Sequence, residues 1–134
     1  IYMEHQRQYL IRCPVDILTD GSIVCQSTVP TDAKVHLMIH NKDSCKQAAT
    51  DAALEARETL EGLTPQLIII FESVIRHKIL GRNLFSEIQA IQEVLGSSVP
   101  LIGMYSLGEL CPLESNYNKG TYLQNANLLL MAIT

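Results

Sequence analysis

The sequence has no tryptophan and only two phenylalanines in 134 residues, and charged side chains make up just 18% of it. The formal net charge is −4. Because phosphate binding requires a basic face, this balance argues against nucleic acid as the main partner. Apolar residues account for 47% of the chain, which is typical of a globular domain and too apolar for a disordered segment.

Long hydrophobic runs are also lacking. The longest, residues 67–71 and 128–133, have the length of a strand, far below the roughly eighteen residues of a membrane span. We therefore expect no membrane partner and a cytoplasmic location. The length indicates one domain, residues 1–134. Since the chain begins Ile1-Tyr2, with no initiator methionine or signal peptide, we expect a domain excised from a longer protein.

The four cysteines form no Cys-x-x-Cys pair and have no histidine at metal-ligand spacing. We expect free thiols and no metal, although Cys13 and Cys25 lie on segments that are predicted to pair, which leaves a disulfide open. No nucleophile elbow, zinc-protease motif or phosphate loop is present. Ser73, His77 and Glu72 form a nominal cluster, but neighbours on one segment do not predict a triad. We expect no enzyme activity and no cofactor.

Apolar periodicity predicts the N-terminal half of the fold. Asp20-Gly21 lies between two alternating apolar runs, which favours a hairpin within residues 8–25 and a type I′ turn. Residues 35–40 alternate and predict a third strand. A helix is expected from Ser44 to about residue 60, with Ser44 and Gln47 as a capping box. Residues 66–71 are almost continuously apolar, which is typical of a central strand buried on both faces.

A second helix is predicted to begin at an Asn83 cap and to end at Gly96. A strand over residues 99–106, a polar loop over 114–120 and a final strand over 123–133 follow. The predicted order is β-β-β-α-β-α-β-β. Because strand–helix–strand crossovers need parallel neighbours and hairpins antiparallel ones, we expect an α+β or mixed α/β fold. It would have a single mixed sheet of about six strands with two principal helices packed on it.

The strand that ends in Gly108-Glu109 is the most informative segment for function. It places backbone amides and a carboxylate at a sheet edge, where small polar ligands are often held. The alternative is a tight turn that leaves a core strand. Tyr105 and Ser106 offer hydroxyl groups just before this turn. Because side chains alternate along a strand, at most one of these two points into any single pocket.

Arg76 follows the buried strand at its carboxyl end, where mixed and parallel sheets hold ligands. Its guanidinium suits a ligand carboxylate. The alternative is a structural ion pair with Glu109 or Glu72. Glu109 suits a ligand ammonium group, so that Arg76 and Glu109 together would fit an amino acid. Asn125 is expected either to bind a ligand or to satisfy a backbone group at a strand end.

Five segments, in order, carry a family resemblance. They are residues 9–12 with 20–22, the helix after His40, residues 71–76, residues 100–109 (Pro-Leu-Ile-Gly-Met-Tyr-Ser-Leu-Gly-Glu), and Asn125 in the terminal apolar stretch. Together they resemble the C-terminal half of the FIST sensory domain, an input module of signal-transduction proteins. The Gly-Tyr-Gly-Glu pattern within residues 100–109 is the most specific part.

The chain departs from the family pattern at two places. Ser73 stands where the family often has the cysteine of a Phe-x-Cys-x-x-Arg pattern, and residues 124–127 keep only the asparagine of a His-Asn-Gln-Thr pattern. The half-domain that usually precedes this one is not in the sequence. The resemblance implies a sensor that binds an amino-acid-like metabolite and relays its occupancy to an attached output domain. The alternative is a protein-interaction or dimerisation module, for instance a homodimer. The expected ligand-binding residues are Arg76, Tyr105, Ser106, Gly108, Glu109 and Asn125.

Overall fold

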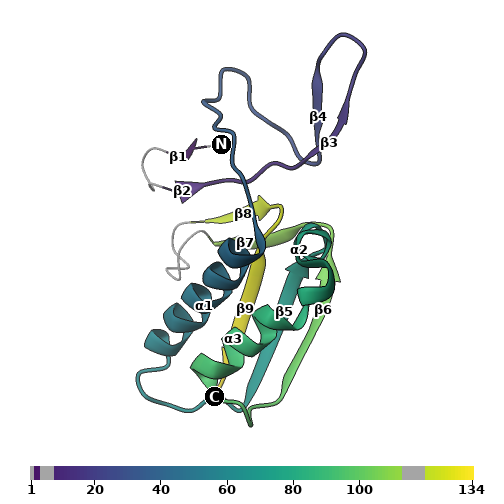
Figure 1. The fold of residues 1–134 in the computed structure, drawn as a ribbon. Helices are drawn as coiled ribbons and strands as arrows, with labels where there is room; N and C mark the ends of the chain where they lie inside the picture. The colour runs from purple at the N-terminus through teal and green to yellow at the C-terminus, as the bar shows by residue number, and fades with distance from the viewer. Residues whose placement is uncertain (1, 4–7, 113–119) are drawn as a thin grey trace.

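The core of the molecule is a three-stranded mixed sheet in the order β6-β5-β9 (Figure 1). The computed structural model describes residues 2–3, 8–112 and 120–134. β5 (Leu67–Ser73) pairs parallel with β6 (Leu101–Ser106) and antiparallel with β9 (Leu128–Ile133). The mixed α+β architecture is confirmed, and β5 is the central strand as predicted. The predicted single sheet of about six strands is not observed, because the other described strands form separate two-stranded pairs.

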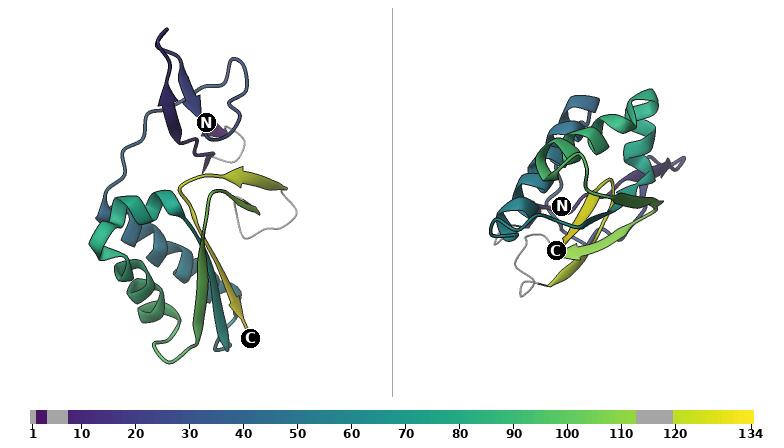
Figure 2. Two further views of the ribbon diagram at one scale, coloured as in Figure 1. Left: turned by 90° about the vertical axis from the view of Figure 1, so that its right-hand side faces the viewer. Right: turned by 90° about the horizontal axis from the view of Figure 1, so that it is seen from below.

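Helices cover one face of this sheet (Figure 2). The two predicted helices are α1 (Lys42–Thr59) and α3 (Phe85–Leu95). Their small and branched side chains pack on the helix-facing side of β5, and alanine at the contact lets α1 approach closely. Burial of these apolar side chains is the main stabilising contribution to the fold. The buried cluster consists of Ala49, Ala53, Ile68, Ile70, Ile91, Leu95 and Val99.

The start of α1 differs slightly from the prediction. Asn41 is the N-cap, and its side chain accepts a 2.8 Å hydrogen bond from the backbone N–H of Ser44. Ser44 Oγ in turn accepts from the Asn41 backbone N–H at 3.0 Å. The capping box is therefore present, but Ser44 takes its third helical position instead of the cap. Gln47 bonds to Asp51 one turn further on.

A short helix that the sequence did not predict connects β5 to α3. α2 (Val74–Leu80) begins directly after β5, and the 3₁₀ helix η1 (Gly81–Asn83) leads on to α3. Because the backbone is already helical before α3, Leu84 occupies its N-cap position without a side-chain cap, and the predicted Asn83 cap is wrong. Gly96 ends α3 as predicted.

The N-terminal segment forms two small antiparallel pairs, β1 (Tyr2–Met3) with β2 (Gln8–Tyr9) and β3 (Pro14–Ile17) with β4 (Ile23–Cys25). The predicted hairpin is confirmed, but its turn is not of type I′. Leu18 accepts from the Gly21 N–H at 3.0 Å and donates to the Ser22 carbonyl at 2.8 Å, so residues 19–21 form the loop. Only Gly21 in this loop has a positive φ, 85°. This is the three-residue hairpin loop with a glycine in the left-handed region.

The predicted strand over residues 35–40 is wrong. These residues precede α1 and form no strand, because no neighbouring strand pairs with them in the described part of the chain. Leu37 is 97% exposed and Ile39 is 89% exposed. Alternation alone predicted a strand there, but a strand requires a partner for its backbone hydrogen bonds.

The predicted final strand is divided into two. β8 (Thr121–Gln124) pairs antiparallel with β7 (Glu109–Pro112), and β9 returns along β5. Residues 125–127 turn the chain between them, with Ala126 at a φ of 57°. The predicted polar loop falls mainly on residues 114–119, which lie outside the described residues.

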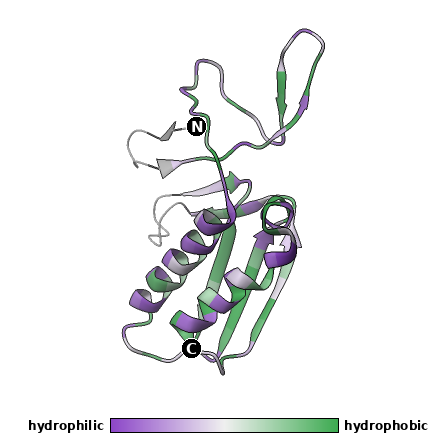
Figure 3. Ribbon diagram, in the orientation of Figure 1, coloured by the Kyte–Doolittle hydropathy of each residue, from purple (hydrophilic) through white to green (hydrophobic). Residues whose placement is uncertain are grey.

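The second face of the sheet is apolar and has no helix over it among the described residues (Figures 2 and 3). Strand register places Phe71 beside Met104 on one side and Leu129 on the other. Ile102 and Met104 are more than 60% exposed. The prediction that β5 is buried on both faces therefore holds fully only on the helix side. None of the described helices is long and apolar enough to cross a membrane.

Candidate functional site

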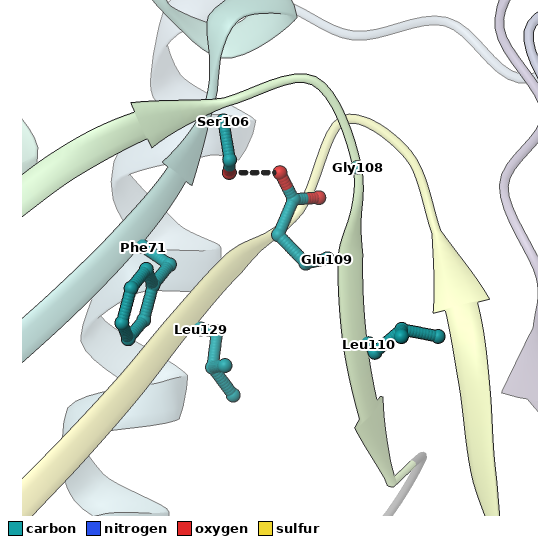
Figure 4. Close-up of a pocket in the computed structure, with 6 residues that line it drawn as sticks. All are labelled: Phe71, Ser106, Gly108, Glu109, Leu110 and Leu129. Atoms are coloured by element: carbon teal, nitrogen blue, oxygen red, sulfur yellow. Dashed lines mark hydrogen bonds between the residues drawn. The ribbon is translucent and has the colours of Figure 1, made fainter.

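A pocket of about 240 Å³ lies on the apolar face, at the carboxyl ends of β5 and β6 (Figure 4). Its walls come from β5, β6, the turn into β7, β7 itself and β9. Three of the predicted site residues meet here: Ser106, Gly108 and Glu109. Among the residues that the structure describes, the lining consists of Phe71, Ser106, Gly108, Glu109, Leu110 and Leu129.

Glu109 is the one charged residue of this lining, and its side chain is only 3% exposed. Ser106 Oγ donates a 2.6 Å hydrogen bond to Oε1 of Glu109 (Figure 4). Oε2 is also buried and has no hydrogen-bond partner of good geometry among the described residues. Because an unpaired buried acceptor is costly, a donor that reaches Oε2 would be favoured.

The surroundings of Glu109 act on its pKa in opposite directions. Burial raises the pKa of this carboxyl group, because the charged form loses its hydration. The Ser106 hydroxyl, the nearby backbone N–H of Asn127 and the positive charge of Arg76 lower it, without cancelling the effect of burial. A bound cation would further favour the ionised form.

Tyr105 lies on the opposite side of the sheet from Ser106. Its ring packs edge-on against His77, with the ring centroids 4.8 Å apart. Because side chains alternate along β6, only one of the two hydroxyl groups can point into the pocket. The residue that supplies it is Ser106.

Arg76, on α2, does not line the pocket. It is 5% exposed, donates from Nη2 to the backbone carbonyl of Cys45 at 2.9 Å, and forms an ion pair with Glu87 of α3. The sequence offered Glu109 or Glu72 as its structural partner, and the observed partner is neither. Arg76 nevertheless lies close enough to both carboxyl groups to lower their pKa values.

Glu72 and Glu87 form a second acidic site, on the helix side of the sheet. Both are buried, and one oxygen of each has no hydrogen-bond partner of good geometry among the described residues. Burial, followed by the proximity of the Glu87 carboxyl group, raises the pKa of Glu72 to about 7, although the positive charge of Arg76 opposes this.

Sequence reasoning missed Glu87, although a signal was present. Residues 87, 91 and 95 share one face of α3, and Ile91 and Leu95 are both in the core. A carboxylate at that spacing must be buried with them. Burial of a charge requires a partner, which Arg76 supplies.

Asn125 and Ser73 have structural roles. Asn125 accepts from the Ser27 hydroxyl at 3.1 Å and donates to the Gln124 carbonyl at 3.1 Å, in the turn between β8 and β9. Ser73 Oγ accepts from the backbone N–H of Ala126 at 3.2 Å and from that of Ile75 at 3.4 Å. Ser73 therefore caps α2 and holds the same turn. Since its lone pairs are used in this way, it forms no triad with His77 and Glu72.

The N-terminal segment contacts the turn next to the pocket. Gln26 donates from Nε2 to the carbonyl of Leu107, and Arg12 donates from Nη1 to the carbonyl of Leu123 at 3.0 Å. The first of these bonds joins the N-terminal segment to the β6–β7 turn, and the second joins it to β8. All four cysteines are free thiols, and burial raises the pKa of Cys13 and Cys111 above the ordinary thiol value.

Together, the mixed sheet, its helices on one face and the carboxylate pocket at its strand ends define an α+β domain with a candidate ligand pocket. The family model described as FIST C domain matches residues 1–112. Because this match covers most of the chain, the protein belongs to the FIST C domain family, a family of sensory domains associated with signal transduction. No curated protein and no solved structure matched the chain significantly. β8 and β9, and with them Asn125 and Leu129, lie beyond the matched residues.

Proposed function

We propose that this domain is a sensor that binds a small ligand carrying an ammonium group, the charge that such a ligand shares with the amino-acid-like metabolites that the family resemblance implies. One observation carries the proposal: Glu109 lines a pocket whose other walls are mostly apolar, and its buried carboxylate has one oxygen without a hydrogen-bond partner of good geometry among the described residues. The ligand's ammonium would donate to Glu109, which Ser106 holds in place. Phe71 and Leu129 would contact its apolar part.

Relay of the signal to an attached output domain is part of the proposal. Ser106 Oγ lies 3.4 Å from the backbone carbonyl of Glu72, and the next residue, Ser73, caps α2. A ligand that draws Ser106 and Glu109 together therefore acts at the point where β5 passes into α2. To signal, the ligand must bind one arrangement of this junction more tightly than another.

A thermal-shift screen against ammonium-bearing metabolites, including the amino acids, tests the proposal. A ligand at a hundredfold excess over its Kd stabilises the folded state by about 2.7 kcal/mol, which raises Tm by several degrees. Glu109→Gln should remove the shift, whereas Glu93→Gln, the same change at an exposed position of α3, should keep it. The absence of any shift across such a panel would count against the sensor.

The uncovered sheet face favours a second candidate function, self-association of two copies. Large exposed apolar patches mark interaction sites, and Ile102 and Met104 are exposed on the edge strand β6 of this one. Apart from the buried Glu109 of the pocket, the residues that β5, β6 and β9 place on this face are uncharged, so two copies that meet across a twofold axis would oppose few like charges. Sedimentation over a range of protein concentrations tests this. Met104→Glu should give a monomer at every concentration, and a wild-type chain that is always monomeric would exclude the dimer.

A further inference from the structure

Among the described residues, no cationic side chain lines the Glu109 pocket. Its lining consists of one carboxylate, one hydroxyl, one glycine and three apolar side chains. A ligand ammonium finds an opposite charge there. A ligand carboxylate finds none, and it would lose its hydration without compensation.

The cation that the sequence predicted for the site, Arg76, already has partners of its own. Arg76 is buried, and its Nη2 is bound both to Glu87 and to the Cys45 carbonyl. If Arg76 turned toward the pocket, Glu87, which is fully buried, would lose its only ion-pair partner among the described residues. Breaking a buried ion pair in this way is strongly unfavourable. Arg76 is therefore not available to bind a ligand carboxylate.

On the basis of the proposed function, we propose that the pocket selects small primary amines with an apolar chain and rejects the corresponding amino acid zwitterions. In an α-amino acid the carboxylate is attached to the same carbon as the ammonium group. When that ammonium group meets Glu109, the two carboxylates come close together and repel each other. A simple amine keeps the attraction and has no such repulsion.

The volume of the pocket and the side chains of its walls further restrict which amines could bind. A volume of about 240 Å³ is below the range of about 300–1,000 Å³ that is typical for drug-sized ligands. Phe71, Leu110 and Leu129 provide apolar contacts for a short branched or aromatic chain. A branched amine of five carbons fits both constraints.

Amine binding should also depend on pH. The amine requires the ionised form of Glu109, whereas burial favours the protonated form. The groups that act on this carboxyl are the Ser106 hydroxyl, the Asn127 backbone N–H and Arg76, and Glu109 itself acts on the Cys13 and Cys111 thiols. Affinity should therefore fall as pH is lowered through the pKa of Glu109. Near that pH, binding should release a proton from the protein.

Isothermal titration calorimetry with four matched compounds tests the inference: isopentylamine, leucinamide, leucine and isovalerate. Isopentylamine and leucinamide should bind at least tenfold more tightly than leucine, and isovalerate should not bind. Leucinamide is the size-matched control, since it has the shape of leucine without the carboxylate charge. Glu109→Gln should abolish amine binding while its Tm stays within a few degrees of the wild type.

Each other outcome has a definite meaning. If leucine binds as tightly as isopentylamine or more tightly, the proposed selectivity is wrong, but the proposed function as a sensor of ammonium-bearing ligands is not contradicted. If leucinamide is as weak as leucine, size and not charge excludes the amino acid, and the charge argument is overturned. If none of the compounds binds to folded protein, and no other ammonium metabolite does, both the selectivity and the proposed function fail.

Discussion

Ser106 and Glu109 face each other across the turn between β6 and β7, joined by a hydrogen bond of 2.6 Å from the hydroxyl to Oε1. This bond fixes one carboxylate oxygen, and the other is buried without a hydrogen-bond partner of good geometry among the described residues. It also stabilises the charged form of Glu109 against the effect of burial. The two residues thus form the polar part of a site that is otherwise apolar.

Ser106→Ala should weaken amine binding without preventing it. Loss of the hydrogen bond raises the pKa of Glu109 further and leaves its carboxylate less well oriented. A hydrogen bond to a charged group contributes about 1.5 kcal/mol, so we expect a loss of roughly tenfold in affinity at neutral pH. Calorimetry at several pH values measures both effects. Ser86→Ala, which removes an exposed hydroxyl on α3, is the control. An equal affinity in the two variants would contradict the role of Ser106.

The buried Glu72 should make stability depend on pH. Its pKa is raised to about 7, so the folded state holds a proton that the unfolded chain releases near the ordinary value. The free energy of unfolding should therefore fall as pH rises from about 4.5 to 7, by on the order of 2 kcal/mol, and level off above that. The charged groups facing Glu72 are Glu87 and Arg76.

Urea denaturation of the wild type and Glu72→Gln across this pH range measures the dependence. The variant cannot ionise at this position, so its stability should vary less with pH and should exceed that of the wild type above pH 7. If the two curves run parallel, Glu72 is not the group that titrates.

Removal of the Arg76 charge should destabilise the fold strongly. Arg76→Met leaves Glu87 buried without a cation, which typically costs about 3–5 kcal/mol. The double variant Arg76→Met with Glu87→Gln should recover part of this loss, because no unpaired charge remains. Chemical denaturation at pH 8 measures both. Arg57→Met, at an exposed position of α1, is the matched control. A loss no larger than that of the control would show that the ion pair is not stabilising.

Gly103 should not tolerate a side chain. A Cβ atom at this position would lie 2.7 Å from the backbone oxygen of Ile70 on the neighbouring strand. Since backbone cannot move away cheaply, Gly103→Ala should lower stability by about 1–3 kcal/mol. Gly108→Ala is the comparison, because the tightest contact of its Cβ would be with the end of the Leu123 side chain, at 3.2 Å, and its other contacts would be at ordinary distances of 3.6 Å or more. Thermal unfolding of the two variants should rank them in this order, and the reverse order would disprove the steric argument.

Local patterns were sufficient for the parts of the fold that depend on local structure. The helical periodicity of α1, the apolar run of β5 and the glycine after α3 all predicted the observed elements. The helix α2 was not predicted from the sequence, because it has only seven residues and follows β5 without a turn. Its start depends on Ser73, whose side chain also binds the turn between β8 and β9, a contact that no local pattern reveals.

The same distinction applies to the site. Ser106, Gly108 and Glu109 are neighbours in the chain, and the sequence placed them together at a strand end. Phe71 and Leu129 come to the pocket only because β9 pairs with β5, which depends on the order of strands. The partner of Arg76 likewise depends on how α3 packs over α2 and β5.

The pairing of β9 with β5 has a consequence for synthesis. The ribosome delivers β5, β6 and β7 well before β9, and domains form in the order in which their segments emerge. Until residues 128–133 have left the exit tunnel, β5 has an open edge and the carboxylate of Glu109 has no wall opposite it. Under the proposed function, a nascent chain is therefore unable to bind its ligand until β9 pairs with β5 and completes the pocket.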